Sequence, residues 1–375
     1  MKNISNLKDC FGCGVCAIAC PTKIITIKEV SGFYQPKFID YDKCINCSLC
    51  LKVCAFYHDS VCNPQNKQNP KTYSAWSNDE STRKTSSSGG ISYEIGTNLL
   101  QKGYKICCAK YNIEQERVEH FIAESIEEFK QSIGSKYIPS FTVNGFSQLN
   151  KTDKFLVIGT PCQIDSIRRY IHTFKIEDNF ILVDFFCHGI PSINMWHKYL
   201  RQIHSKITNI NHVSWRDKDT GWHDSYAMKF TGKTNGQEIT FRSPKSQKDL
   251  FFQMFFGHHC LSKACYKDCK YKQLASAADI RIGDLWGTKY KNYDKGVSSV
   301  ITFSPKGENI IKSINIHCQE EKPKIVLGHQ LKSCVKQPQS YRWTKWALAT
   351  PLNLTFIAFV ARLINFCSRI LNPRQ

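Results

Sequence analysis

Short apolar runs alternate with longer helical segments between residues 89 and 340. The runs at 155–158 and 180–186 predict buried strands, each followed by a helix, the first ending near residue 171 and the second spanning about 192–205. Strands that alternate with helices in this way indicate neighbouring parallel strands in an α/β sheet. The other runs predict strands over 104–111, 118–123, 226–231, 237–242 and 278–282 and a helix over 91–101.

The first part of the chain has a different pattern. Residues 1–62 contain two short predicted strands, at 23–30 and 34–39, among segments rich in cysteine. Residues 63–83 are rich in Asn, Ser, Lys and Pro, which predicts a linker into a domain over 84–340.

The tail over 341–375 contains a predicted amphipathic helix at 352–371. Its central Arg362 argues against a membrane span. Two alternatives remain, namely packing on the protein's own core and peripheral contact with a membrane interface. The predicted apolar face comprises Phe356, Ile357, Val360, Leu363, Ile364, Cys367, Ile370 and Leu371.

Eight of the 19 cysteines form two runs with the same spacing. In each run two residues separate successive members of the first three cysteines, and three residues precede the fourth. This is the spacing of bacterial two-cluster ferredoxins, in which three cysteines of a run bind one cluster and the fourth binds the other. The first predicted 4Fe-4S cluster takes Cys10, Cys13, Cys16 and Cys54, and the second takes Cys44, Cys47, Cys50 and Cys20.

Zinc and disulfides explain these runs less well. Structural zinc sites use two separated Cys-x2-Cys pairs rather than three cysteines in step. Disulfides need an oxidising compartment, and the first ten residues contain no apolar signal segment. The many thiols favour a cytoplasmic setting. The second run departs from the ferredoxin pattern only at Ala55, where proline is usual.

The charge of the chain bears on its partners. Lys and Arg number 51 against 31 Asp and Glu, which gives a formal net charge of +20. This charge suits an acidic redox carrier such as a ferredoxin, a flavin phosphate, or an anionic membrane surface. No nucleic-acid partner is expected, because no nucleic-acid-binding motif accompanies the charge.

Cysteines in the second half predict a third 4Fe-4S cluster. Cys162 and Cys187 each follow a predicted strand, so parallel neighbours would place both thiols at the carboxyl edge of the sheet, where α/β proteins bind ligands. Burial as small core residues is the alternative for these two cysteines. The favoured ligands are Cys162, Cys187, Cys265 and Cys269, chosen from a group that also includes Cys260.

A Ser- and Gly-rich stretch offers a phosphate site. Ser87-Ser88-Gly89-Gly90 opens the helix at 91–101, and free N–H groups at a helix start favour an anion such as a flavin phosphate. A plain cap or linker is the alternative. Thr160 can cap the predicted helix that ends near residue 171, and Pro161 suits its first turn. His188 could act as an acid or donate to a flavin, although a histidine after a strand is more often structural.

Several motifs together resemble a known family. Besides Ser87–Gly90 they are Gly134–Tyr137, Gly159–Gln163, Asp184 with Cys187–Ser192, Arg216–Lys218 with Gly221-Trp222, and Asp279-Ile280 with Gly283–Gly287. In this order they resemble the coenzyme F420 hydrogenase/dehydrogenase beta subunit family over residues 5–290. One departure is Cys265–Cys269, which is a residue longer than the Cys-Tyr-x-Cys usual in the family.

The resemblance implies an iron–sulfur flavoprotein. Members of the family pass electrons between clusters and a flavin, typically FAD, which exchanges hydride with a deazaflavin or another organic substrate. Members with a ferredoxin module also occur in bacterial surface-polysaccharide gene clusters. The expected cofactor-binding residues are Ser87, Ser88, Gly89, Gly90, Thr160, Pro161, Gln163 and His188.

The expected fold is therefore an α+β ferredoxin-like two-cluster module followed by an α/β flavin-binding domain with a mixed sheet. The expected function is a cytoplasmic oxidoreductase that receives electrons from a soluble carrier such as ferredoxin or a deazaflavin. One alternative is a non-catalytic electron-transfer subunit that feeds a partner oxidoreductase. The other is a non-catalytic module at a membrane-bound polysaccharide assembly.

Overall fold

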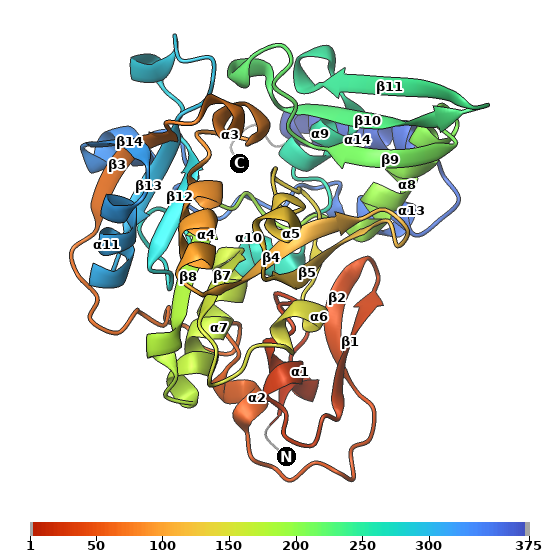
Figure 1. The fold of residues 1–375 in the computed structure, drawn as a ribbon. Helices are drawn as coiled ribbons and strands as arrows, with labels where there is room; N and C mark the ends of the chain where they lie inside the picture. The colour runs from red at the N-terminus through yellow and green to blue at the C-terminus, as the bar shows by residue number, and fades with distance from the viewer. Residues whose placement is uncertain (1–2, 372–375) are drawn as a thin grey trace.

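The computed structural model describes residues 3–371, and its largest sheet has nine strands. Their order is β14-β3-β13-β12-β8-β7-β4-β5-β6 (Figure 1). Strands β12, β8, β7 and β4 pair in parallel, and antiparallel neighbours flank them on both sides. The bounds are β3 Lys71–Ser77, β4 Lys105–Asn112, β5 Arg117–Ala123, β6 Ser140–Phe141, β7 Phe155–Gly159, β8 Phe180–Phe185, β12 Ile280–Asp284, β13 Ser298–Thr302 and β14 Ile316–Glu320.

Helices cover both faces of this sheet. On one face, α4, α5 and α11 bury apolar side chains against β4, β7, β8 and β12. On the other face, α7 lies against β7 and β8 and begins with Pro161, as predicted. The Thr160 N–H donates to the Gln163 side chain at 2.9 Å, so Gln163 caps the N-terminus of α7. The bounds are α4 Ile91–Gln101, α5 Ile126–Lys130, α7 Pro161–Thr173 and α11 Pro305–Ser313.

The cysteine-rich module occupies the lower end of the molecule in Figure 1 and packs against the same face as α7. Its Val15, Ala19 and Val53 are buried in one cluster with Val157 of β7 and Ile164 of α7. The module and the α/β domain therefore share a hydrophobic core. Its elements, with the adjoining α6, are α1 Val15–Ala19, the antiparallel hairpin β1 Ile25–Val30 and β2 Phe33–Phe38, α2 Leu49–Lys52 and α6 Val143–Phe146.

The linker predicted over 63–83 was wrong in its second half. Residues 71–77 form β3, which lies between β14 and β13, and α3 (Glu80–Thr85) follows it. The sequence pattern did not reveal this strand, because its polar residues are buried and form hydrogen bonds instead of facing solvent. Thr72 donates to the Glu321 carbonyl, and the Tyr73 hydroxyl donates to the Glu308 carboxylate at 2.9 Å.

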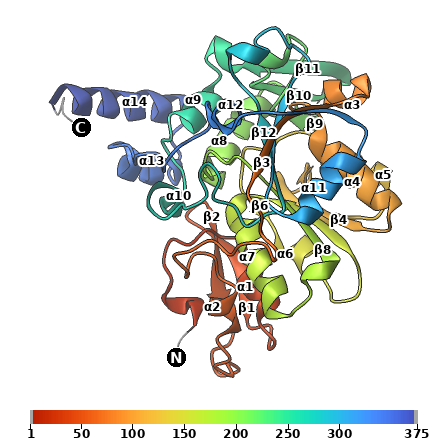
Figure 2. The same cartoon turned by 90° about the vertical axis from the view of Figure 1, so that its left-hand side faces the viewer.

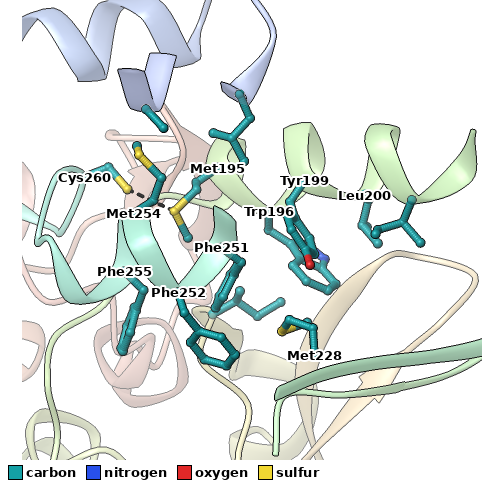
Figure 3. Close-up of a cluster of buried hydrophobic side chains, with 14 of the residues drawn as sticks. Met195, Trp196, Tyr199, Leu200, Met228, Phe251, Phe252, Met254, Phe255 and Cys260 are labelled. Atoms are coloured by element: carbon teal, nitrogen blue, oxygen red, sulfur yellow. Dashed lines mark hydrogen bonds between the residues drawn. The ribbon is translucent and has the colours of Figure 1, made fainter. Parts of the chain in front are cut away.

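A smaller antiparallel sheet packs with helices around an aromatic core (Figure 3). It has the order β11-β10-β9, and the predicted turn at Asn235-Gly236 joins two of its strands. Trp196, Trp215 and Phe251 are fully buried in this core. The elements are α8 Ile193–His204, β9 Asn209–Ser214, β10 Ala227–Thr234, β11 Gln237–Pro244, α9 Leu250–Phe256, α13 Tyr341–Leu348 and α14 Leu354–Leu371, with α10 Lys263–Lys267 and α12 Pro323–Leu327 elsewhere.

Helix α14 packs on the protein's own core, but apart from Ile357 it does so through residues outside the predicted apolar face. Helix α14 buries Leu354, Ile357, Ala358 and Ala361, whereas most of the large apolar residues of the predicted face are exposed. The small alanines allow close approach to α8, α9 and α13, so packing selects them although apolar residues surround most of the helix. By length and composition alone, α14 is the one helix among residues 3–371 that could cross a membrane.

We expect Trp196→Ala to lower the free energy of unfolding by about 3–5 kcal/mol, because it leaves a cavity in the aromatic core. The matched control is Trp346→Ala on α13, which removes a side chain that is 60% exposed and should cost less than about 0.5 kcal/mol. Urea titration followed by circular dichroism measures both changes. Equal losses would contradict the placement of Trp196.

Candidate functional site

A cavity of about 610 Å³ lies at the carboxyl ends of β7, β8 and β12. Its volume is within the range of small-molecule and cofactor sites, and its position is the usual one in α/β folds. The cysteine module closes one side through Cys10, Phe11 and Tyr34. Of the predicted residues, Gly89 and Pro161 do not line the cavity. Those that do are Ser87, Ser88, Gly90, Thr160, Gln163 and His188.

The Ser87–Gly90 loop is anchored from behind by two strands. The Ser77 N–H donates to the Gly89 carbonyl at 2.7 Å, and the Gly89 N–H donates to the Ser298 hydroxyl at 2.9 Å. A Cβ on Gly89 would lie 2.6 Å from the Ala75 carbonyl oxygen, so only glycine fits there. Gly90, with φ of 89°, is the N-cap of α4, so the first turn of α4 faces the cavity without a capping side chain.

The buried Arg216 joins four of the sequence motifs. It donates to both carboxylate oxygens of Asp284, at 2.7 and 3.2 Å, and to the Ser87 carbonyl at 3.0 Å and the Tyr137 hydroxyl at 3.2 Å. Burial alone would lower the pKa of Arg216, but the Asp284 carboxylate raises it well above its ordinary value. The indole N–H of Trp222 also donates to Asp284, at 3.0 Å. This network holds the serine loop at the cavity.

Two lysines are enclosed by backbone carbonyls beside the cavity. Lys136, which lines it, donates to the carbonyls of Ser132, Ile133 and Gly134. Burial lowers the pKa of Lys136 to about 8. Lys218 donates to the carbonyls of Ser88, Arg83 and Lys295 at 2.7, 2.8 and 2.9 Å and so ties down the serine loop. Burial, followed by the charge of Arg216, lowers the pKa of Lys218 to about 7.

His120 is a cavity residue that no sequence pattern predicted. Its Nε2 lies 3.2 Å from the Ile158 carbonyl oxygen, while its Nδ1 has no hydrogen-bond partner among residues 3–371. Burial lowers the pKa of His120 to about 4, so the neutral ring donates through Nε2 and leaves Nδ1 as an acceptor. Nothing marked His120 in the sequence, because it lies in the middle of β5 with no motif around it.

The ring of His188 is packed among other aromatic rings. Its ring lies 5.2 to 5.6 Å from those of Phe255 and Phe256 and stacks on His258 at 4.9 Å. Burial, followed by the charge of His258, lowers the pKa of His188 to about 4. The ring is therefore neutral at pH 7 and can exchange hydrogen bonds with a ligand, but it supplies no positive charge.

The eight N-terminal cysteines fall into two groups in space. Burial raises the pKa of Cys16 well above its ordinary value, and Cys13, Cys10 and Cys54 lie near enough to raise it further, each more than Cys50 of the second run does. The other four, Cys20, Cys44, Cys47 and Cys50, line one small cavity of about 20 Å³. Cys54, the fourth cysteine of the second run, thus lies with the first three of the first run. Cys20, the fourth cysteine of the first run, lies with the first three of the second run. Thiolates gathered in this way need positive charge between them, which fits iron–sulfur clusters.

Four cysteines of the second half also lie near one another. Besides burial, Cys187 and Cys265 contribute to raising the pKa of Cys162, and Cys187 and Cys269 contribute to raising that of Cys265. Among residues 3–371 no three Cys, His, Asp or Glu side chains converge closely enough for a single metal ion. A cubane has a separate iron for each thiolate, so its ligands need not converge on one point.

Two further cysteines, Cys260 and Cys334, do not belong to the three groups of predicted ligands and form hydrogen bonds. Cys260 lies in the aromatic core, where its thiol contacts the Met195 sulfur at 3.4 Å, so it stands apart from the group of four (Figure 3). Cys334, for which the sequence predicts no role, donates to the Cys269 carbonyl at 2.9 Å. Nothing in its local sequence pointed to this position.

Helix α7 brings the two cysteine regions together. The Ser166 hydroxyl lies 3.2 Å from the Cys13 sulfur and accepts the Ala55 N–H at 3.1 Å. The neighbouring Asp165 accepts the Cys62 N–H at 3.0 Å. Cys162 precedes Ser166 by four residues and so lies on the same side of the helix. Cys13 is indeed near enough to Cys162 to contribute to its raised pKa.

Family models match three parts of this chain. Residues 9–57 match the 4Fe-4S dicluster domain, residues 72–145 the N-terminal part of the coenzyme F420 hydrogenase/dehydrogenase beta subunit, and residues 152–324 its C-terminal part. The expected order, a ferredoxin-type module followed by an α/β domain with a mixed sheet, is confirmed.

Individual relatives cover smaller parts. A subunit of the F(420)H(2) dehydrogenase of Methanosarcina mazei is 27% identical over 173 residues, which are 42% of this chain and 47% of that protein. The trichloroethene reductive dehalogenase of Dehalococcoides mccartyi is 41% identical over 58 residues, 13% of this chain and 10% of that protein. The matched region thus spans less than half of either relative.

One solved structure with a similar chain is the F420-reducing NiFe hydrogenase complex from Methanosarcina barkeri. The superposition covers 82% of this chain and 92% of that chain, with 16% identity and a TM-score of 0.45.

We expect Asp284→Ala to lower the free energy of unfolding by about 3–5 kcal/mol, because it leaves the buried Arg216 without its carboxylate. The matched control is Glu80→Ala, which breaks an ion pair with Lys295 whose side chains are 79% and 61% exposed. That change should cost less than about 1 kcal/mol. Thermal unfolding of both variants measures the difference, and equal losses would contradict the role of Arg216.

Proposed function

Because the chain belongs to the coenzyme F420 hydrogenase/dehydrogenase beta subunit family, we propose that it is an iron–sulfur flavoprotein oxidoreductase. In this proposal it passes electrons between 4Fe-4S clusters and a flavin, and then to a deazaflavin or another organic substrate. One observation carries the proposal: a single cavity has the Ser87–Gly90 loop on one side and the cysteine module, through Cys10, on the other.

We assign the cluster ligands to the groups that lie together in space. When bound, the clusters supply one-electron exchange. The first group is Cys10, Cys13, Cys16 and Cys54, the second is Cys20, Cys44, Cys47 and Cys50, and a third cluster would use Cys162, Cys187, Cys265 and Cys269.

The volume and the lining of the cavity support a flavin as its ligand, FAD being the typical one in this family. When bound, a flavin can exchange electrons singly or in pairs, which suits a protein that also holds one-electron centres. The start of α4 offers N–H groups to a phosphate, and Lys136 adds positive charge. The Nδ1 of His120 is a buried acceptor without a partner in residues 3–371, so a ligand N–H or O–H would satisfy it. Phe11 and Trp286 give the cavity apolar walls that exclude water.

Electrons would come from a soluble carrier: a ferredoxin, or a reduced deazaflavin where another organic substrate is the acceptor. The net charge of +20 favours an acidic carrier. The proposed location is the cytoplasm, including the inner face of the membrane, and the organic substrate would belong to surface-polysaccharide biosynthesis. The basis for that substrate class is the family resemblance to members found beside polysaccharide genes.

The second candidate is a non-catalytic electron-transfer subunit that feeds a partner oxidoreductase. It is favoured by the name of the Methanosarcina mazei relative, which is a subunit of a dehydrogenase. A partner that remains bound through purification and is needed for substrate turnover would favour this candidate over an independent enzyme.

The first test is the iron and flavin content of the chain purified without oxygen. We expect about one flavin with either eight or twelve irons per chain, where twelve would include the third cluster. About eight irons without flavin would reject the flavoenzyme and leave a ferredoxin-like carrier.

A loop variant sharpens this test. We expect Gly89→Ala to reduce flavin content while iron content stays unchanged, because the added Cβ pushes the loop away from the Ala75 carbonyl. Gly236→Ala is the control: its Cβ would meet nothing within 4 Å, and the strain from its φ of 81° falls on the β10–β11 turn rather than on the Ser87–Gly90 loop. Equal flavin content in the two variants would argue against the loop as part of the flavin site.

The hydroxyl of Ser166 provides a test of the first ligand group. A cluster-bound Cys13 sulfur carries no proton, so this hydroxyl would donate to it across the observed 3.2 Å. Hydrogen bonds to sulfur stabilise the reduced, more negative cluster. We therefore expect Ser166→Ala to lower the reduction potential of the first cluster alone, measured by redox titration with electron paramagnetic resonance.

The matched control acts on the other group. The Thr22 hydroxyl lies 3.5 Å from the Cys20 sulfur, so Thr22→Val should move the potential of the second cluster and leave the first unchanged. If both variants shift the same signal, the division of the cysteines into these two groups is wrong.

A further inference from the structure

Helix α14 exposes a continuous apolar stripe. Phe356, Phe359, Leu363, Phe366 and Ile370 follow one another at intervals of three and four residues, so they lie along one side of the helix. Their exposed fractions are 47%, 56%, 47%, 62% and 62%. Single exposed apolar residues are ordinary, but a stripe of five large ones marks an interaction surface.

The stripe points away from the protein. At 100° per residue it is centred about half a turn from the buried Leu354, Ile357, Ala358 and Ala361, which pack on the aromatic core. Figure 2 shows α14 running along the outside of the molecule and extending beyond its neighbours. With one face packed on protein and Arg362 in its middle, α14 cannot be surrounded by lipid, so a spanning arrangement does not fit.

The charges of the segment that carries the stripe all have one sign. No Asp or Glu occurs in residues 322–371. Arg362 and Arg369 lie along one border of the stripe, and the neighbouring α13 carries Arg342, Lys345 and the exposed Trp346. The basic residues of the segment are Lys322, Lys324, Lys332, Lys336, Arg342, Lys345, Arg362 and Arg369.

We propose that the exposed face of α14 binds the surface of an anionic lipid bilayer. The stripe lies in the interface, Arg362 and Arg369 meet acidic headgroups, and the opposite face keeps the helix attached to the protein. Charge complementarity selects lipid over a second copy of this chain, because two copies would bring together two segments that carry only positive charge. The proposal goes beyond the electron transfer proposed above and does not depend on a bound flavin.

The test is flotation of the full-length chain, kept free of oxygen, with vesicles of phosphatidylcholine mixed with phosphatidylglycerol. We expect the protein to float with these vesicles, to bind pure phosphatidylcholine more weakly, and to be released as salt rises. The double variant Phe359→Glu/Phe366→Glu should lower the bound fraction about tenfold or more, since it places charges on the buried side of the interface. Arg369→Gln should weaken only the preference for anionic vesicles.

The control is Ile126→Glu, which changes an isoleucine that is 38% exposed on α5, on the other side of the molecule from α14 (Figure 2). It should bind like the unaltered chain, and equal iron content and circular dichroism would show that all variants fold. The proposal is overturned if the unaltered chain stays in the lipid-free fraction at low salt, or if the control loses binding equally. It is also overturned if light scattering finds a lipid-free dimer that the double variant abolishes, because a second copy would then cover the stripe.

Discussion

The burial of the first eight residues of α7, Pro161–Arg168, is the constraint on which the rest of the molecule depends. Ile164, Ile167 and Ile171 pack on the central strands, while Asp165 and Ser166 bind the cysteine module. On the same helix Arg168 donates to Asp279 at 2.8 Å and to the Ala277 carbonyl at 2.9 Å, which fixes the start of β12. Because α7 is bound by the central strands, by the cysteine module and by the start of β12, the cysteines on and beside it have little freedom to change position. The relative positions of the three cysteine groups and the cavity thus follow from one packing arrangement.

The cavity itself depends on buried polar groups rather than on apolar packing. Arg216 and Lys218 each bond the serine loop, and Asp284 binds Arg216 in turn. Ser87 and Arg216 are 129 residues apart in the sequence, and Arg216 and Asp284 are 68 residues apart. Buried polar networks of this kind are costly unless every member is paired, and they fix one arrangement of the chain when they are. The motifs that appeared separate in the sequence are parts of this single network.

The sequence predicted the features that local rules govern. The spacing of the cysteines indicated the dicluster module, and apolar runs located β7, β8 and β12 and indicated that β7 and β8 are parallel neighbours. Features that depend on distant partners were missed. The composition of β3 predicted a linker because the polar residues of this strand are paired by β14 and α11, and His120 had no local pattern. The sequence also left open what covers the apolar face of α14, since alanine size rather than apolar content decided which side approaches the core.

The core shared by the module and the domain has a consequence for how the protein is assembled. Cys13 contacts Ser166 of α7, and Cys54 is buried next to Ala55, whose N–H donates to the same hydroxyl, so docking covers these two thiols. A scaffold protein that delivers iron and sulfide needs access to them. Delivery therefore has to precede or accompany closure of the module on α7. The packing of Val15, Ala19 and Val53 on α7 therefore determines the order of maturation. For the same reason, another ferredoxin unit could replace this module only if it had a matching apolar face.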